Sequence, residues 1–305
     1  RRRGSQSENL IKLALTIAAL GHDAGHPGQN NSFFVSRSEP LALVYNDKSV
    51  LENYHAYLTF AVMTDRDCNI LRGFPVETYQ SLRKTIIELI LATDMSLHFS
   101  ALSTAKLRIE MADFDYFNKP EDQLLVCKVC MKAADLGHLT LDWDSHRQWV
   151  ARLSEEYFRQ GDIENLRGQS ISPMCDRTKA DELPTLQSGF LGFVALPLFL
   201  QLDVISNRSS HTREVVRSVE KNADLWKMLP PEKCALDTSL FDKESTKSAA
   251  DENKSTAAPT GLTITPSDFS PQLMSHSSPG STYTETSMPP ANILLLSPTV
   301  APESP

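Results

Sequence analysis

Apolar residues recur every three or four positions through most of the first 230 residues, which is the spacing of one face of an α-helix. Residues 8–20 and 81–95 are two clear examples. Their apolar stripes are Leu10, Leu13, Ala14, Ile17 and Ala18 in the first, and Leu82, Ile86, Ile87 and Ile90 in the second. Clear alternation of apolar and polar residues, which is typical of a half-buried strand, is absent. The pattern predicts an all-α fold, a compact multi-helix bundle.

Local signals mark the starts of two of these helices. Ser49 followed by Glu52 resembles a capping box in front of the apolar residues 50–63. Pro75 stands where a second helix would open, in the segment "PVETYQSLRK", because proline is well tolerated at the first turn.

The composition changes after about residue 237. From residue 255 to residue 305 the chain holds no Lys or Arg, and Ser, Thr and Pro dominate. Such a segment cannot bury enough apolar surface to offset the entropy lost on ordering. We therefore expect a helical domain over residues 1–236 and a disordered Ser/Thr/Pro-rich tail over residues 237–305. A short apolar run at residues 292–296 leaves a protein partner for the tail open, although we favour an incidental patch.

Charge, hydropathy and cysteine content exclude several classes of protein. A net charge of −8 argues against a nucleic-acid partner, because such surfaces are usually basic. The uncharged residues 188–202 fall short of the ~20 needed for a membrane span, so we predict a buried helix there, bent at Pro197. Cys127 and Cys130 have no second CxxC or His pair at zinc-ribbon spacing, so we interpret them as core residues. With no secretory signal and few cysteines, we expect a cytoplasmic protein.

The segment "LGHDAGHPGQNN", residues 20–31, concentrates four potential metal ligands: His22, Asp23, His26 and Asn30. The spacing of the two histidines mimics the HExxH helix of zinc proteases. Pro27 disfavours helical geometry at His26, however, so the two imidazoles need not share a helix face. The alternative is a site at the end of the preceding helix, where His22 and Asp23 bind metal together with ligands from other helices.

A further candidate ligand comes much later in the chain. Asp135 follows the apolar, helical segment "LLVCKVCMKAA", where a carboxylate is costly to bury unless it is paired or bound to a metal. For a single Asp, an ion pair or a helix cap is the commoner explanation. The combination of a His-Asp pair, a second His, a nearby Asn and this distant Asp favours a metal site.

Seven segments then resemble the catalytic domain of class I 3′,5′-cyclic nucleotide phosphodiesterases, in the order found in that family. They are "HDAGHPGQNN", "VYNDKSVLENYHA", "LATDMSLH", "AADLGH", "HRQWVARLSEEYFRQGD", "ISPMCDR" and "LQSGF". The resemblance covers roughly residues 8–230. It implies the all-helical, HD-type fold of that family and hydrolysis of cAMP, cGMP or both to nucleoside 5′-monophosphates in signal transduction.

The resemblance also implies two divalent metals, zinc and magnesium, with manganese as an alternative to magnesium. His22, Asp23 and Asp135 would be the ligands, and Asp23 would be shared by both ions. A hydroxide activated by the two metals would attack phosphorus in line. His26 and Glu52 would surround the second metal and its waters and, with Asp23, form the catalytic group. For Asn30, His55 and Asp94, structural hydrogen bonding is as good an explanation as catalysis.

At the substrate end, the resemblance assigns base recognition to Gln187, whose amide offers both a donor and an acceptor to a purine edge. Phe190 lies one helical turn later and would stack on the base, with Leu153 as the opposite wall. Met95 would line the pocket, and Asp23 and Asp135 would contact the substrate through the metals.

The family's upstream motif, Tyr-His-Asn followed by His-Ala-x-Asp, would lie before Arg1. It contains one metal-binding histidine and the histidine that serves as general acid for O3′, so we expect this chain to be weakly active or inactive. The first residue is Arg rather than Met, which favours a truncated piece of an active enzyme. The alternative is an inactive protein that binds cyclic nucleotides or another protein. His138 and the loop at residues 174–187 depart from the family pattern and leave nucleotide preference open, and the sequence does not fix an oligomeric state.

Overall fold

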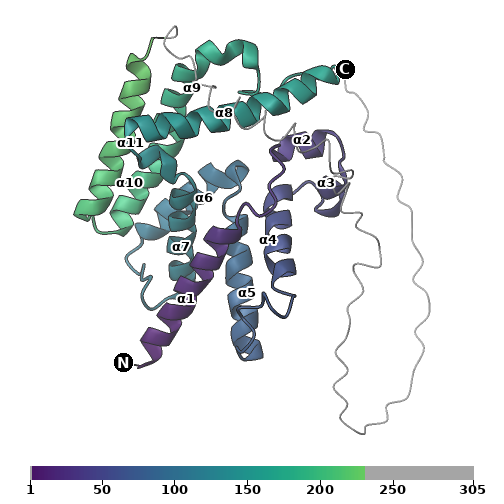
Figure 1. The fold of residues 1–305 in the computed structure, drawn as a ribbon. Helices are drawn as coiled ribbons and strands as arrows, with labels where there is room; N and C mark the ends of the chain where they lie inside the picture. The colour runs from purple at the N-terminus through teal and green to yellow at the C-terminus, as the bar shows by residue number, and fades with distance from the viewer. Residues whose placement is uncertain (1, 231–305) are drawn as a thin grey trace, which may run out of the picture. The chain divides into compact units, whose positions relative to one another are not determined.

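A computed structural model describes residues 2–230, and in this part of the chain the secondary structure is helical with no strand, as predicted (Figure 1). The helices are α1 (Arg2–Gly21), α2 (Asn31–Ser36), α3 (Pro40–Val44), α4 (Val50–Val62), α5 (Val76–Leu91), η1 (Met95–Leu97), α6 (His98–Ile109), α7 (Pro120–Asp135), η2 (Gly137–Thr140), α8 (Trp143–Leu166), η3 (Arg177–Glu182), α9 (Leu183–Gly189), η4 (Phe190–Ala195), α10 (Leu196–Ile205) and α11 (Ser210–Met228). The predicted boundary near residue 237, the tail and its apolar run lie outside the described residues.

The first apolar core lies among α1, α4, α5 and one side of α7. Both predicted stripes face it. Ala14, Ile17 and Ala18 of α1 are buried, as are Leu82, Ile86 and Ile90 of α5, and Leu10, Leu13 and Ile87 pack against them. Burial of these stripes holds α1 against α5 and fixes where the C-terminal end of α1 lies.

The second core lies among the other side of α7 and the helices from α6 to α11. Its largest side chain is Trp226 of α11, which is 1% exposed. The indole Nε1 of Trp226 donates a hydrogen bond of 2.8 Å to Nε2 of His146 in α8, so the polar atom of this large ring is paired inside the core.

Helix α7 is shared by the two cores. Cys127 and Met131, one helical turn apart, belong to the first core, while Val129 and Ala133 belong to the second. Burial on both sides leaves α7 little freedom to shift or rotate, and the helix ends at Asp135. Cys127 is therefore a core residue as predicted, and Cys130 on the same helix is a half-buried free thiol.

The prediction of a buried helix at residues 188–202 holds for one face only. Leu191, Leu198 and Phe199 are buried, but Phe193 is 79% exposed and Leu200 is 46% exposed. The helical run Arg177–Ile205 is long and apolar enough to cross a membrane, and α5 with the bent segment Met95–Ile109 would also pass as one broken span. Core helices of soluble proteins meet the same criteria, and here the run supplies part of the second core.

Pro197 lies beside an irregular turn of this run, and the bend predicted there stays a prediction. The turn immediately before Pro197 is a π-helix, and Pro197 lies in the first turn of α10. A proline there has no N–H to donate to the preceding turn, so the regular α-helical bonding is interrupted.

The capping box predicted at Ser49 is wrong, although α4 does begin at Val50. Ser49 adopts a left-handed backbone conformation, with φ of 42°, and its side chain makes no cap hydrogen bond. Its Oγ instead donates to Oδ2 of Asp94 at 2.6 Å, and Glu52 bonds to Asn31. Both side chains are taken by tertiary partners that a local motif does not reveal.

The two faces of α10 provide a matched test of the second core. Leu198→Ala removes a side chain that is 0% exposed and should lower the free energy of unfolding by about 2–5 kcal/mol. Leu200→Ala, two residues further on the outer face, should change it by less than about 1 kcal/mol. Urea unfolding followed by circular dichroism measures both, and equal losses would contradict this placement of the core.

Candidate metal centre

The C-terminal end of α1 is held against α4 by a close approach at Gly21. A Cβ atom at this position would lie 2.3 Å from Oγ1 of Thr59, so only glycine allows the contact. The Thr59 hydroxyl is bonded to the carbonyl oxygens of Gly21 and His55, at 3.1 and 2.8 Å. The contact places His22 directly after the end of the helix, with Asp23 next to it in the same turn.

Helix α1 ends at Gly21, and His22 is the first residue of the turn that follows. The amide of Ala24 bonds to the carbonyl of Gly21, and Gly25 has a φ of 68°, which is a left-handed conformation. His26 therefore lies in the turn beyond α1 and does not share a helix face with His22. This geometry is unlike the HExxH helix of zinc proteases.

The distant Asp135 is the third member of the group. Nε2 of His22 lies 3.2 Å from Oδ1 of Asp135 and 3.4 Å from Oδ2 of Asp23. One ligand atom from each of the three residues lies within 4.8 Å of the others. The structure thus brings together the three residues predicted as metal ligands, although 112 positions separate Asp23 from Asp135 in the sequence.

The imidazole of His22 is oriented for this role. Its Nδ1–H donates to the carbonyl of Ala19 at 2.9 Å, so in the neutral ring the lone pair is on Nε2, which faces both carboxylates. An imidazole fixed in this way by a backbone carbonyl, with two carboxylates beside it, is a typical donor set for zinc. The three residues therefore fit a divalent cation.

Without a cation, the carboxylates favour a proton on His22. The hydrogen bond with Asp135 is the main reason that the pKa of His22 rises from 6.5 to about 9. Burial of the ring opposes this shift, whereas the charge of Asp23 adds to it.

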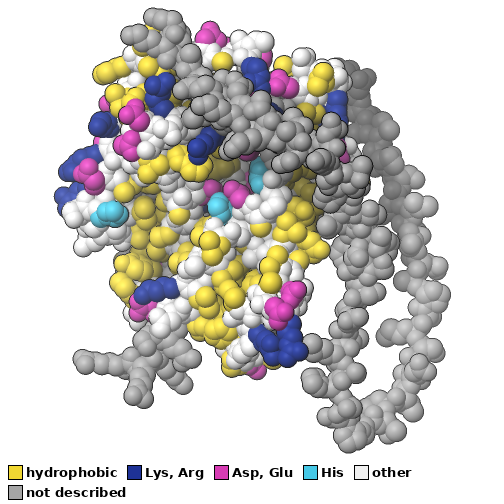
Figure 2. Space-filling view, viewed as in Figure 1, with side chains coloured by type: hydrophobic (Ala, Val, Ile, Leu, Met, Phe, Trp, Pro, Cys, Tyr) yellow, Lys and Arg dark blue, Asp and Glu magenta, His cyan; other side chains and the backbone are white. Residues whose placement is uncertain are grey.

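Figure 2 shows acidic and histidine side chains gathered near the middle of the visible face, bordered by apolar surface. The Asp23 side chain is 62% exposed, so solutes can reach the group.

Two further histidines pack beside Asp23. His55 of α4 is 1% exposed and bonds through Nδ1 to the carbonyl of Ala24 at 2.7 Å, which leaves Nε2 3.9 Å from Oδ1 of Asp23. Burial lowers the pKa of His55. The ring of His26 stacks on His55 at 5.6 Å, and its Nδ1 accepts a bond from the Gly28 amide. His55 thus supports the turn that carries Asp23.

Glu52 is held by a residue that the sequence analysis did not single out. Nδ2 of Asn31 donates to both carboxylate oxygens of Glu52, at 3.0 and 3.3 Å, while Oδ1 of Asn31 accepts from the Leu51 amide. Burial raises the pKa of Glu52, and the charges of Asp94 and Asp23 raise it further. The neighbouring Asn30, which the sequence analysis did name, caps α2 through its Oδ1.

Comparison with known proteins decides the family. The sequence profile described as 3′5′-cyclic nucleotide phosphodiesterase matches residues 4–216. The chain belongs to this family. It is 40% identical over 240 residues to the dual 3′,5′-cyclic-AMP and -GMP phosphodiesterase beta of Plasmodium falciparum, which covers 79% of this chain and 21% of that protein. It is 35% identical to the cGMP-specific 3′,5′-cyclic phosphodiesterase alpha of the same organism, over 71% of this chain and 23% of that protein.

A solved structure agrees with this assignment. The phosphodiesterase domain of the RhoPDE fusion protein from the choanoflagellate Salpingoeca rosetta superposes with a TM-score of 0.67 at 31% identity, covering 72% of this chain and 68% of that one. This supports the phosphodiesterase fold predicted for the described helices. The chain spans less than a quarter of the length of the two Plasmodium relatives.

The other phosphodiesterase residues predicted at the site lie on three separate segments. Gln187 is on α9 and Phe190 begins η4, both half-buried, and Leu153 is half-buried on α8. Phe190 also packs against the second core. Met95 is 40% exposed in η1, which Asp94 caps by accepting a bond from the Ser96 amide. Asp94 thus has a structural role, while the roles of Gln187, Phe190, Leu153 and Met95 remain predictions.

The pairing of His22 with Asp135 can be tested by titration. In protein freed of divalent cations, His22 should titrate near pH 9, and Asp135→Asn should return its pKa toward 6.5. Because the folded-state pKa is raised, the pair stabilises the fold fully below about pH 6.5, and this contribution is lost as the pH rises through about 9. NMR of the imidazole resonances measures the midpoint, with Asp224→Asn on α11 as a control. A midpoint near 6.5 in the unsubstituted protein would contradict the geometry.

Proposed function

We propose that the enzyme whose catalytic helices this sequence forms hydrolyses 3′,5′-cyclic nucleotides to nucleoside 5′-monophosphates at the centre formed by His22, Asp23 and Asp135, and that full turnover also needs the family's upstream histidine motif. The observation that carries the proposal is the convergence of these three donors from α1 and α7 in a chain of the phosphodiesterase family. We further propose zinc and magnesium as the bound ions, with manganese able to replace magnesium. Nitrogen and carboxylate donors together suit such a mixed pair.

Divalent cations bound here would supply the positive charge that stabilises the negative oxygens of a phosphodiester during attack by water. The protein's own contribution is orientation. Asp135 presents a fixed donor because it ends the packed helix α7, and His22 does so because it directly follows the packed helix α1. Asp23 is supported by the buried ring of His55. Residues that hold ligands in this way typically change metal affinity or activity by about 10- to 100-fold when they are removed.

Glu52 and His26 are proposed to act beside the ligands. Glu52 is half-buried and accepts hydrogen bonds from Asn31, and the charge of Asp23 contributes to its raised pKa. These observations support a role in which Glu52 accepts hydrogen bonds from water near the ions. His26 stacks on His55 and has Oε1 of Glu156 3.9 Å from its Nδ1. These contacts support a role for both residues in orienting water and substrate.

At the other end of the substrate, we propose that Gln187 recognises the purine edge and that Phe190 and Leu153 enclose the base, with Met95 at the wall of the pocket. Half-burial of Gln187, Phe190 and Leu153 supports this role, because their side chains are neither fully inside the core nor fully in solvent. One Plasmodium relative carries a dual-specificity name and the other a cGMP-specific name, so both cAMP and cGMP are substrates to test.

The direct test is hydrolysis of cAMP and cGMP, with Zn²⁺ and Mg²⁺, by the purified chain and by a version extended at its N-terminus with the family's Tyr-His-Asn and His-Ala-x-Asp motif, measured by chromatography of the 5′-monophosphates. Asp135→Ala should reduce turnover by more than about 100-fold, because it removes a ligand rather than a supporting residue. Asp224→Ala, which removes a surface acid of α11, should leave turnover unchanged. Nucleotide binding without turnover by the extended version would contradict the proposal and favour a protein that only binds the nucleotide.

A further inference from the structure

Lys132 is a buried cation close to the proposed metal centre. It lies on α7 one helical turn before Asp135 and is only 3% exposed. Its Nζ donates a hydrogen bond of 3.1 Å to the carbonyl of Ala92. Lysine is rarely buried to this degree unless nearby acidic groups balance its charge. The groups around the ammonium therefore indicate its role.

The surroundings of Lys132 are acidic. Its partner Ala92 lies two residues before Asp94, whose carboxylate is bonded to Ser49 at the start of α4. Glu52 lies in the first turn of that helix. Burial lowers the pKa of Lys132, while the charges of Asp135, Asp94 and Glu52 all act in the opposite direction. The positive charge of Lys132 thus interacts with the charges of carboxylates from three separate segments.

We propose that Lys132 is a positioning residue that sets the cation affinity of the metal centre through its positive charge. The ammonium reduces repulsion among the carboxylates around it when no cation is present, and it opposes a divalent cation beside Asp135. Inside a protein, a charge acts over several ångströms with much less screening than in water. This inference rests on the proposed function, because it assumes that His22, Asp23 and Asp135 bind a cation.

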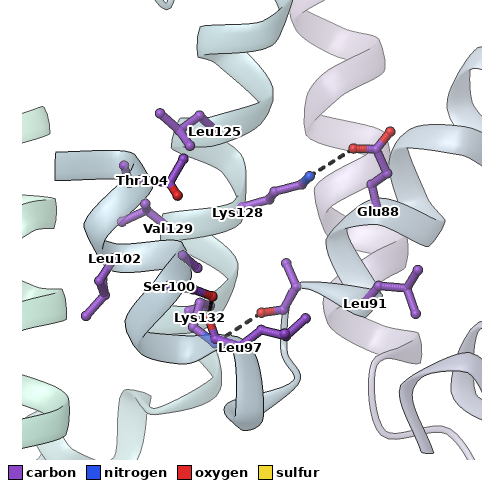
Figure 3. Close-up of a pocket in the computed structure, with 13 residues that line it drawn as sticks. Glu88, Leu91, Leu97, Ser100, Leu102, Thr104, Leu125, Lys128, Val129 and Lys132 are labelled. Atoms are coloured by element: carbon purple, nitrogen blue, oxygen red, sulfur yellow. Dashed lines mark hydrogen bonds and ion pairs between the residues drawn. The ribbon is translucent and has the colours of Figure 1, made fainter. Parts of the chain in front are cut away.

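Lys128, one turn earlier on α7, is a natural control. Figure 3 shows Lys128 and Lys132 lining the same cavity, of about 410 Å³, between α5, α6 and α7. Nζ of Lys128 pairs with Glu88 at 2.9 Å, and the Lys128 side chain is 35% exposed. Its charge is therefore already balanced and partly screened by water, unlike the charge of Lys132.

The test is calorimetric titration of Mn²⁺ alone into the full chain after removal of bound metal, at pH 7.5. Lys132→Gln keeps an N–H donor for the Ala92 carbonyl but removes the charge. It should bind Mn²⁺ about tenfold more tightly, because one opposing charge is gone. Lys132→Arg keeps the charge and Lys128→Gln removes a charge that is already paired, so both should stay within about twofold of the unsubstituted chain.

A purely structural lysine gives a different result. If Lys132→Gln retains its helical circular dichroism but binds Mn²⁺ equally or more weakly, the inference is overturned while the metal centre stands. If the unsubstituted chain binds no Mn²⁺, the metal centre and the inference both fail. Lys132→Met provides a second neutral variant if Lys132→Gln does not fold. If neither neutral variant folds, Lys132→Arg is the deciding variant. A change of more than about threefold in its Mn²⁺ affinity would contradict the proposal that the charge of Lys132 sets this affinity.

Discussion

Burial of α7 between two apolar cores is the constraint on which the site depends. Residues on one side of this helix pack with α1 and α5, and residues on the other side pack with α6 and α10. A helix held on both sides can present its last residue in only one place. That residue is Asp135, and the place is the end of α1, where His22 and Asp23 lie.

The same packing creates the electrostatic problem that a cation would solve. Two carboxylates and an imidazole converge at the ends of rigid helices, so they cannot move apart without disturbing the cores. In the absence of a cation, a proton on His22 reduces the repulsion between the two carboxylates, as the raised pKa of that residue indicates. A proton and a metal therefore compete for the same nitrogen, which couples cation binding to pH.

The fold class could be predicted because it leaves a strong local pattern, and the three central residues could be predicted because their combination and the family's motifs, rather than any one residue, indicate a metal site. Helical stripes mark the buried faces of α1 and α5, and a His-Asp pair at a helix end is notable when a second His, an Asn and a distant Asp accompany it. The supporting residues leave weaker patterns. Asn31 rather than Asn30 holds Glu52, and Ser49 bonds to Asp94 instead of capping α4, because each bond joins segments far apart in the chain.

The burial of the charged Lys132 side chain was equally hard to predict from the sequence. Lys132 stands beside two alanines in a segment whose apolar character favoured attention to Asp135 alone, and only the packing of α5 and α7 shows that its ammonium is enclosed. The exposed side of α10 is the opposite case. A run without charges predicts burial all round, yet Phe193 and Leu200 face outward because neighbouring helices cover only one side of the run.

The most direct test of the account is a crystal structure of the chain grown with Zn²⁺, with data collected at the zinc absorption edge. We expect an anomalous peak about 2.0–2.2 Å from Nε2 of His22 and from carboxylate oxygens of Asp23 and Asp135. A peak at another place in the protein, or none in crystals that contain zinc, would contradict the claim that these three residues form a metal centre.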